Sequence, residues 1–182
     1  MLFCAVSAIV FAATRPAEAQ LSGPTRGEGA YFHFGLGPAI VQDFGNSGAV
    51  VLPGAQANGG IGVFLGRDLA VGLAVDVTGA WDVRAPATEP NLILSSAQAA
   101  VRYYPEPRQG IFALAGLGLA GEGIPGDSAD FTGVGATLGL GWDAFDRGFG
   151  LHAGYTPRLL ALSATPRFAH AVAIGAYVLL GL

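Results

Sequence analysis

The stretch that decides the fold is Gly60 to Trp81, which reads GIGVFLGRDLAVGLAVDVTGAW. On both sides of Gly66-Arg67-Asp68, large apolar residues occupy every second position, and mostly small or polar residues lie between them. Successive side chains of a strand point to opposite faces, so this period of two predicts a β-hairpin with one bulky apolar face.

The composition indicates which solvent meets that apolar face. Of the 182 residues, 52% are apolar and only 12% are charged, whereas a typical soluble domain carries roughly a quarter charged residues. No uninterrupted apolar run reaches the ~18 residues of a spanning helix. Because every backbone polar group in lipid must be paired, a closed barrel is the remaining way to span. The sequence therefore predicts lipid outside and a tight polar interior.

The same alternation recurs in six further stretches, near residues 31–40, 91–104, 111–120, 133–143, 149–158 and 171–182. Loop residues fill 42–54, 82–90, 122–130 and 161–167, and short turns lie at Arg67, Glu106 and Asp146. Outer-membrane barrels alternate short periplasmic turns with longer extracellular loops. We therefore predict an all-β, eight-stranded, antiparallel up-and-down transmembrane barrel with four extracellular loops and periplasmic ends.

The beginning of the chain is typical of a secretory leader. Leu2 to Ala13 is a short apolar core, and Ala17-Glu18-Ala19 offers small residues for cleavage. We expect a signal peptide over 1–19, a periplasmic lead-in over 20–29 and the barrel over 30–182. The single cysteine, Cys4, lies in the leader, so the mature chain would have no thiol.

Alternation also predicts which polar side chains point into the barrel. They are His33, Asp76, Thr78, Ser96, Gln98, Arg102, Thr137, Asp143, His152, Thr156 and Arg158. Buried charges must be paired, so we expect Asp76 and Asp143 to bond to Arg102, Arg158 or Gln98. Side chains just fill an eight-stranded barrel, which favours a network that plugs the lumen. A proton or ion pathway, or a narrow solute slot, is the alternative.

Catalytic and cofactor sites find little support in the sequence. A nucleophile and base could come from His152 or His170 with Ser95, Ser96 or Ser163, but no motif surrounds them. Residues 116–121 match the dinucleotide fingerprint without a helix to follow it. Residues 126–130 offer too few oxygen ligands for calcium. The net charge of −4 also disfavours nucleic acid. We expect no enzyme activity, cofactor or metal.

These features together resemble the small outer-membrane β-barrel family that includes the OmpA transmembrane domain, OmpX and OmpW. The resemblance rests on the glycine-rich hairpin at 60–73, eight alternating strands and an apolar last strand. It implies residence in the outer membrane of a Gram-negative bacterium, contact with lipid and lipopolysaccharide, and insertion by the barrel assembly machinery. One departure is Leu182 at the end of the sequence, where family members commonly have an aromatic residue.

The functional prediction is a non-enzymatic integral membrane protein whose barrel is an anchor and whose loops meet the environment. A narrow passive channel for small solutes or ions is one alternative. A soluble, lipocalin-like binding protein is the other.

Overall fold

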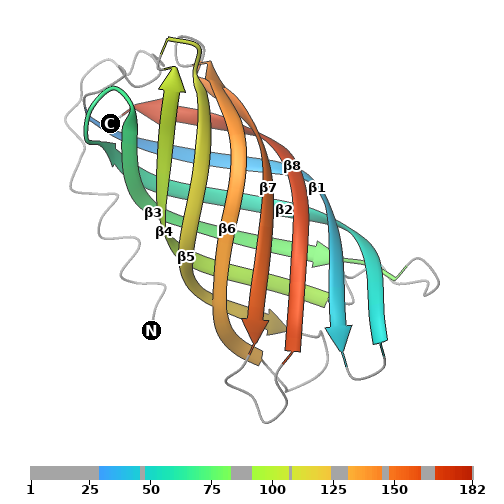
Figure 1. Ribbon diagram of the computed structural model, residues 1–182. Helices are drawn as coiled ribbons and strands as arrows, with labels where there is room; N and C mark the ends of the chain where they lie inside the picture. The colour runs from blue at the N-terminus through green and yellow to red at the C-terminus, as the bar shows by residue number, and fades with distance from the viewer. Residues whose placement is uncertain are drawn as a thin grey trace, which may run out of the picture.

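The computed structural model describes residues 29–45, 48–82, 92–106, 108–123, 131–144, 148–160 and 167–181. These residues form one closed antiparallel barrel (Figure 1). Its strands are β1 (Ala30–Gly45), β2 (Gly48–Phe64), β3 (Leu69–Ala80), β4 (Leu92–Glu106), β5 (Ile111–Gly123), β6 (Phe131–Ala144), β7 (Phe149–Leu160) and β8 (Arg167–Gly181). Each strand pairs with the next, and β8 closes the barrel on β1. The described residues include no helix long and apolar enough to cross a membrane. The predicted fold class is confirmed.

The barrel has two different ends, which we name the turn end and the loop end. At the turn end, short connections join β2 to β3, β4 to β5 and β6 to β7. Gly110 and Gly148 have φ of 76° and 66° there, a conformation that side chains rarely adopt. The first pair of β1 and the last of β8 lie at this end too, since Tyr31 pairs with Gly181. At the loop end, the connecting residues 46–47, 83–91, 124–130 and 161–166 lie outside the described residues.

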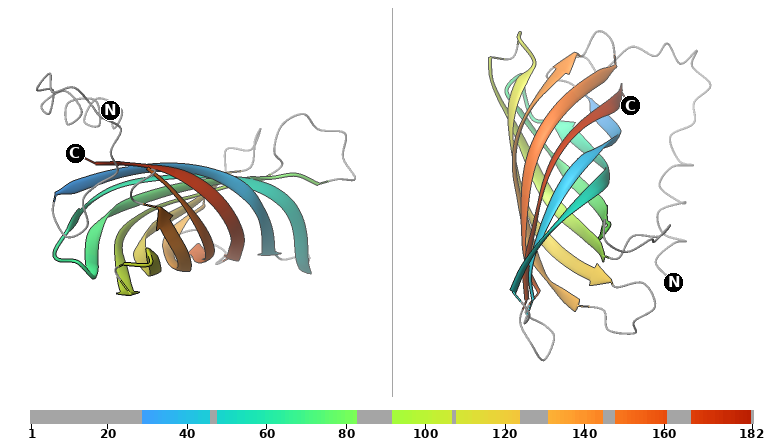
Figure 2. Two further views of the ribbon diagram at one scale, coloured as in Figure 1. Left: turned by 90° about the horizontal axis from the view of Figure 1, so that it is seen from above. Right: turned by 90° about the vertical axis from the view of Figure 1, so that its right-hand side faces the viewer.

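Large apolar side chains cover the outside of the barrel. Leu73, Leu138 and Ile174, from three different strands, are 64%, 59% and 64% exposed. Figure 2 shows the tilted strands that carry them around the wall. Near the turn end, the rings of Trp142 and Phe149 meet edge to face at 5.8 Å, as expected for an aromatic belt at a membrane surface. The predicted inversion, with bulky residues outward, is confirmed.

The predicted loop over residues 42–54 is wrong, because the structure continues the β1–β2 ladder through almost all of it. Gln42 pairs with Val51, and the ladder extends to Gly45 opposite Gly48. Pro53 is tolerated within β2, where its carbonyl accepts a hydrogen bond from the Trp81 N–H. The apolar run Val50, Val51 and Leu52 suits a strand, and this preference prevails over the turn residues around it.

The other strand boundaries differ from the prediction by a few residues at most. Strands β4 and β5 each run further than predicted, to Glu106 and Gly123. Residues 1–28 and Leu182 lie outside the described residues. The leader over 1–19 and the lead-in over 20–29 therefore stay predictions.

Candidate functional site: a polar lumen

The seven residues predicted to form the polar network all lie on the inward face of their strands. They are His33 on β1, Asp76 on β3, Gln98 and Arg102 on β4, Asp143 on β6, and His152 and Arg158 on β7. On these five strands the inward positions alternate with the exposed residues of the outer face, so the strand period alone aims the side chains at the lumen. Four of the seven form two ion pairs, one between Asp76 and Arg158 and one between Arg102 and Asp143. The other three, His33, Gln98 and His152, line a cavity between the pairs.

A direct ion pair spans the middle of the lumen. Arg158 Nη2 lies 2.5 Å from Asp76 Oδ1, and the Arg158 side chain is fully buried. The same carboxylate accepts hydrogen bonds from the Ser96 hydroxyl and, at 3.3 Å, from the Gln56 amide. Gln98 donates in turn to Ser96 Oγ at 3.0 Å. Polar side chains from β2, β3, β4 and β7 are thus joined across the barrel.

The second pair lies toward the turn end and is built from aromatic residues. Asp143 accepts hydrogen bonds from the hydroxyls of Tyr104, at 2.6 Å, and Tyr177. Arg102 lies 3.7 Å from the Asp143 carboxylate. Its guanidinium carbon lies 5.2 Å, 4.9 Å and 5.4 Å from the ring centres of Tyr31, Phe112 and Tyr177.

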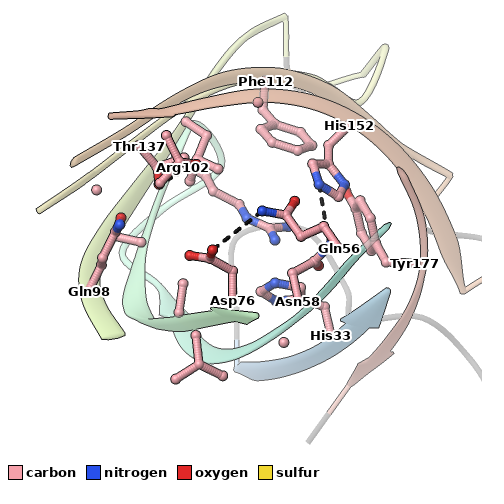
Figure 3. Close-up of a pocket in the computed structure, with 18 residues that line it drawn as sticks. His33, Gln56, Asn58, Asp76, Gln98, Arg102, Phe112, Thr137, His152 and Tyr177 are labelled. Atoms are coloured by element: carbon pink, nitrogen blue, oxygen red, sulfur yellow. Dashed lines mark hydrogen bonds between the residues drawn. The ribbon is translucent and has the colours of Figure 1, made fainter. Parts of the chain in front are cut away.

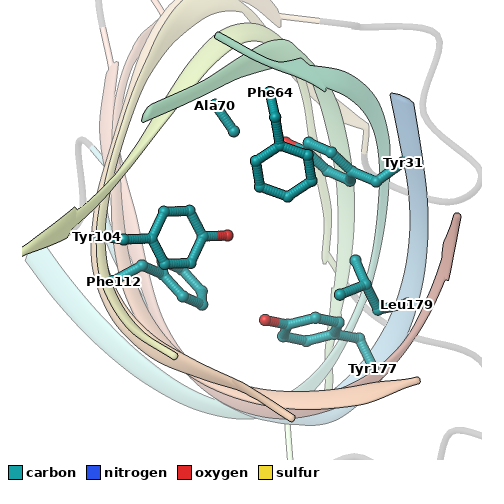
Figure 4. Packing of buried hydrophobic residues seen from close by; sticks show 7 residues of the cluster. All are labelled: Tyr31, Phe64, Ala70, Tyr104, Phe112, Tyr177 and Leu179. Atoms are coloured by element: carbon teal, nitrogen blue, oxygen red, sulfur yellow. The ribbon is translucent and has the colours of Figure 1, made fainter. Parts of the chain in front are cut away.

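The rings around Arg102 belong to a buried cluster that fills the turn end. Its members are Tyr31, Phe64, Ala70, Tyr104, Phe112, Tyr177 and Leu179, and we call it the aromatic plug. Figure 4 shows these side chains directed into the barrel from the surrounding strands. A guanidinium over ring faces is favoured in a dry site. The plug therefore packs the turn end of the interior and places the Arg102 charge close to Asp143 and to the ring faces.

A small cavity remains between the two ion pairs. Its volume is about 60 Å³, and its lining includes His33, Asn58, Thr137 and His152 (Figure 3). Asn58 Nδ2 and His152 Nε2 lie 3.4 Å apart across it. A water molecule needs roughly 10–15 Å³ of such volume, so the cavity holds a few waters at most.

Aliphatic side chains pack together at the loop end of the lumen. They are Val41, Leu52, Ala80, Leu92, Leu94, Ala169 and Ala171, contributed by β1, β2, β3, β4 and β8. Glu122 on β5 is also buried here, with 2% exposure. The lumen therefore consists of a polar middle between two packed ends.

The structure also positions the residues considered for catalysis and cofactor binding. Ser96 bonds to Asp76, whereas His170 bonds to Gln42 on the outer face. Ser163 and residues 126–130 lie outside the described residues. Residues 116–121 belong to β5, and the next element among the described residues is the strand β6. No group of three His, Cys, Asp or Glu side chains suited to a metal occurs in the described part of the chain.

Sequence reasoning missed several lumen residues. Gln56 and Asn58 lie on β2 ahead of the predicted hairpin, and continuing its alternation backward from Gly60 would have placed both inward. Glu122 was assigned to a loop. The strand alternation directs Tyr31, Tyr104 and Tyr177 inward, but no sequence pattern indicates that two of their hydroxyls meet one carboxylate.

Comparisons with known proteins agree with this architecture. No family model and no curated protein sequence matches the chain. Among solved structures, Neisserial surface protein A is 19% identical, with 83% of this chain and 99% of that chain covered and a TM-score of 0.58. Ail of Yersinia pestis is 15% identical, with 85% and 99% covered and a TM-score of 0.55. The N-terminal barrel of Pseudomonas aeruginosa OprF is 19% identical, with 85% and 99% covered and a TM-score of 0.50.

At these identities the likeness concerns the fold. It confirms, at that level, the resemblance to small outer-membrane barrels that the sequence indicates. The apolar exterior argues against the soluble binding protein, whose bulky side chains would fill the interior. The chain is an eight-stranded β-barrel of the outer-membrane type.

Proposed function

We propose that this protein is a non-enzymatic integral outer-membrane protein whose barrel is an anchor with a closed lumen. The observation that carries the proposal is the packing of the interior. The aromatic plug fills the turn end and aliphatic residues fill the loop end. Only about 60 Å³ stays open between them. A barrel filled in this way can hold its loops at a membrane surface without passing solutes.

The orientation follows from the connections. Short turns are periplasmic in barrels of this class, and longer loops are extracellular. At the loop end the connections β3–β4, β5–β6 and β7–β8 are longer than any at the turn end, so the turn end with Ala30 and Gly181 would face the periplasm and the loop end would face outside. Any partner of this protein would then meet those connections.

The absence of enzyme activity is supported by the positions of the candidate groups. A serine nucleophile needs a base within hydrogen-bond reach. Among the described residues, the hydrogen bonds of His152 and His170 go to Asn58 and Gln42, and Ser96 serves Asp76. The described histidines are therefore not arranged to activate a serine.

A narrow channel is the second candidate, favoured by the polar cavity between the ion pairs. Planar-bilayer recordings separate the two. We expect no stable open level for the natural sequence, because the plug must move before water can cross. A stable open level that Asp76→Asn or Arg102→Ala abolishes would replace the closed anchor by the channel. Recovery of most of the protein in an aqueous fraction without detergent would contradict both.

A further inference from the structure

At the loop end, the hairpin of β1 and β2 runs further than β3 beside it (Figure 1). The β1–β2 ladder ends only at Gly45 opposite Gly48, and β8 pairs with β1 almost as far. On the other side of β2, the last described hydrogen bond with β3 runs from the Trp81 N–H to the Pro53 carbonyl. Residues 48–52 are therefore an edge that no other described residue pairs on that side. We call them the β2 edge.

Strand geometry decides which main-chain groups the β2 edge presents. The N–H and C=O of one residue in an antiparallel strand point to the same side, and successive residues alternate. Pro53 directs its carbonyl toward β3. Ala49 and Val51, at even spacing from Pro53, therefore direct their N–H and C=O groups toward the open side, and the residues between them face β1. An unpaired row of this kind is a template for a further strand.

The side chains of the β2 edge suit an uncharged partner strand. The edge reads Gly-Ala-Val-Val-Leu, with no charged residue. Val50 and Val51 are 46% and 62% exposed, on opposite faces of the strand. Edge strands are commonly blocked by charged side chains or by proline. Here Pro53 lies where β3 is already bonded, so neither device blocks the edge itself.

The β2 edge lies at or beyond the level of the lipid headgroups. Trp81, bonded to the residue next to the edge, is directed outward by the strand alternation. Tryptophan favours the headgroup level of a membrane. On β1, the polar residues Gln42 and Asp43 lie opposite Val51 and Val50. A strand arriving from water can therefore reach the edge at the loop end.

We propose that the β2 edge binds an extended, uncharged segment of a partner protein, which adds a strand to the wall of the barrel. Main-chain hydrogen bonds to Ala49 and Val51 would hold the segment, and the two exposed valines would favour small or β-branched residues beside them. The inference rests on the proposed function, which turns the loop end outward. It assigns the contact to the backbone of one strand, where the proposed function names only the loop end.

Amide hydrogen exchange of the full chain in detergent micelles tests whether the β2 edge is open. We expect the N–H groups of Ala49 and Val51 to exchange fast, because no described residue accepts from them. Those of Val50 and Leu52 face β1 and should exchange slowly. Slow exchange at Ala49 and Val51 would mean that the edge is already covered, and would overturn the proposal.

A synthetic peptide of alternating threonine and valine, capped at both ends and carrying a fluorophore, is the probe. Its binding, followed by fluorescence anisotropy, should slow the exchange of the Ala49 and Val51 amides. A copy methylated at every backbone nitrogen should not bind, because it cannot donate to the edge. Binding by the methylated copy, or no binding of the first peptide to the folded barrel, would contradict the proposal.

Two variants at one position separate the backbone from the side chain. Val51→Pro removes one N–H of the edge without breaking a described hydrogen bond, and should weaken peptide binding about tenfold. Val51→Thr keeps that N–H and should restore binding. Both should keep the heat-modifiable gel mobility of a folded barrel. Equal binding by Val51→Pro, or a dimer of the protein in place of the peptide complex, would overturn the partner segment.

Intact Gram-negative cells carrying the protein separate this inference from the proposed function. A peptide that binds in micelles should also bind such cells from outside, and Val51→Pro should reduce that binding. Binding in micelles but not to cells would contradict the outward orientation of the loop end, while the β2 edge itself would stand. Failure in micelles, with the barrel folded, would contradict the edge alone.

Discussion

The two arginine–aspartate pairs of the lumen are both buried, yet they are stabilised in different ways. In the middle, Arg158 contacts Asp76 directly at 2.5 Å, and hydroxyl and amide groups complete the site. Its carboxylate is 12% exposed and borders the cavity. Toward the turn end, Arg102 stays 3.7 Å from Asp143 and lies among three aromatic rings. The first pair depends on charge contact beside space for water, and the second on aromatic packing.

The difference between the two ion pairs shows two ways in which a narrow barrel can bury charged side chains in its interior. A carboxylate beside a cavity can replace a lost hydrogen-bond donor by water, whereas a carboxylate that does not border the cavity cannot. An arginine over ring faces, however, keeps favourable contacts when its acid is neutralised. Neutralising the acid should therefore cost more stability at the middle pair, whereas removing a hydroxyl donor should cost more at the pair near the turn end.

The largest effect is expected from neutralising the acid of the middle pair. Asp76→Asn leaves the fully buried Arg158 without its acidic partner, and breaking a buried pair in this way costs about 3–5 kcal/mol. Asp143→Asn should cost less than about 2 kcal/mol, because the amide still accepts from a tyrosine hydroxyl and Arg102 keeps its rings. Urea unfolding in lipid vesicles, followed by tryptophan fluorescence, measures both. Equal losses would show that the aromatic rings do not support Arg102.

The order should reverse when a hydroxyl donor is removed. Tyr177→Phe takes a hydrogen bond from Asp143, a buried carboxylate that does not border the cavity, and should cost about 1.5–3 kcal/mol. Ser96→Ala takes one from Asp76 beside the cavity, and a water there should limit the loss to about 1 kcal/mol. The same unfolding assay tests the order. A larger loss for Ser96→Ala would contradict a hydrated middle and a dry turn end.

Much of this architecture could be predicted because the strand period carries the information. Alternation alone assigned Leu73 outward and Asp76 inward, and both assignments agree with the structure. It failed over residues 42–54, where Gly45, Gly48 and Pro53 are typical of a loop although the neighbouring residues favour pairing. Local turn residues do not show how far a hairpin extends, since that depends on the strands packed beside it.

For the charged residues of the lumen, the sequence predicts the charge of the partner but not which residue it is. That the two aspartates need positive partners follows from burial, but the choice of Arg158 for Asp76 depends on strand tilt and barrel register. The two tyrosine hydroxyls on Asp143 come from β4 and β8, far apart in sequence. No spacing rule brings them together, so only the closed barrel reveals the aromatic plug.

Two glycine variants, one of which has the smallest expected effect, locate the boundary between the packed end and the cavity. An alanine Cβ at Gly141 would meet the Phe112 ring of the plug and lie 2.7 Å from the Leu151 carbonyl oxygen. Such overpacking costs about 1–3 kcal/mol. At Gly154, which lines the cavity, the nearest atoms are 4.0 Å away. Gly154→Ala should therefore be neutral or gain about 0.5–1 kcal/mol by restricting the unfolded chain.

Comparison of Gly141→Ala with Gly154→Ala in the same vesicles controls for the general effect of replacing a strand glycine. Both residues lie on inward faces, on the adjacent strands β6 and β7. A difference between them therefore reports the local packing of the lumen. If both variants lost the same stability, the cavity would be filled as tightly as the aromatic plug, and the contrast between the two ion pairs would need another cause than water.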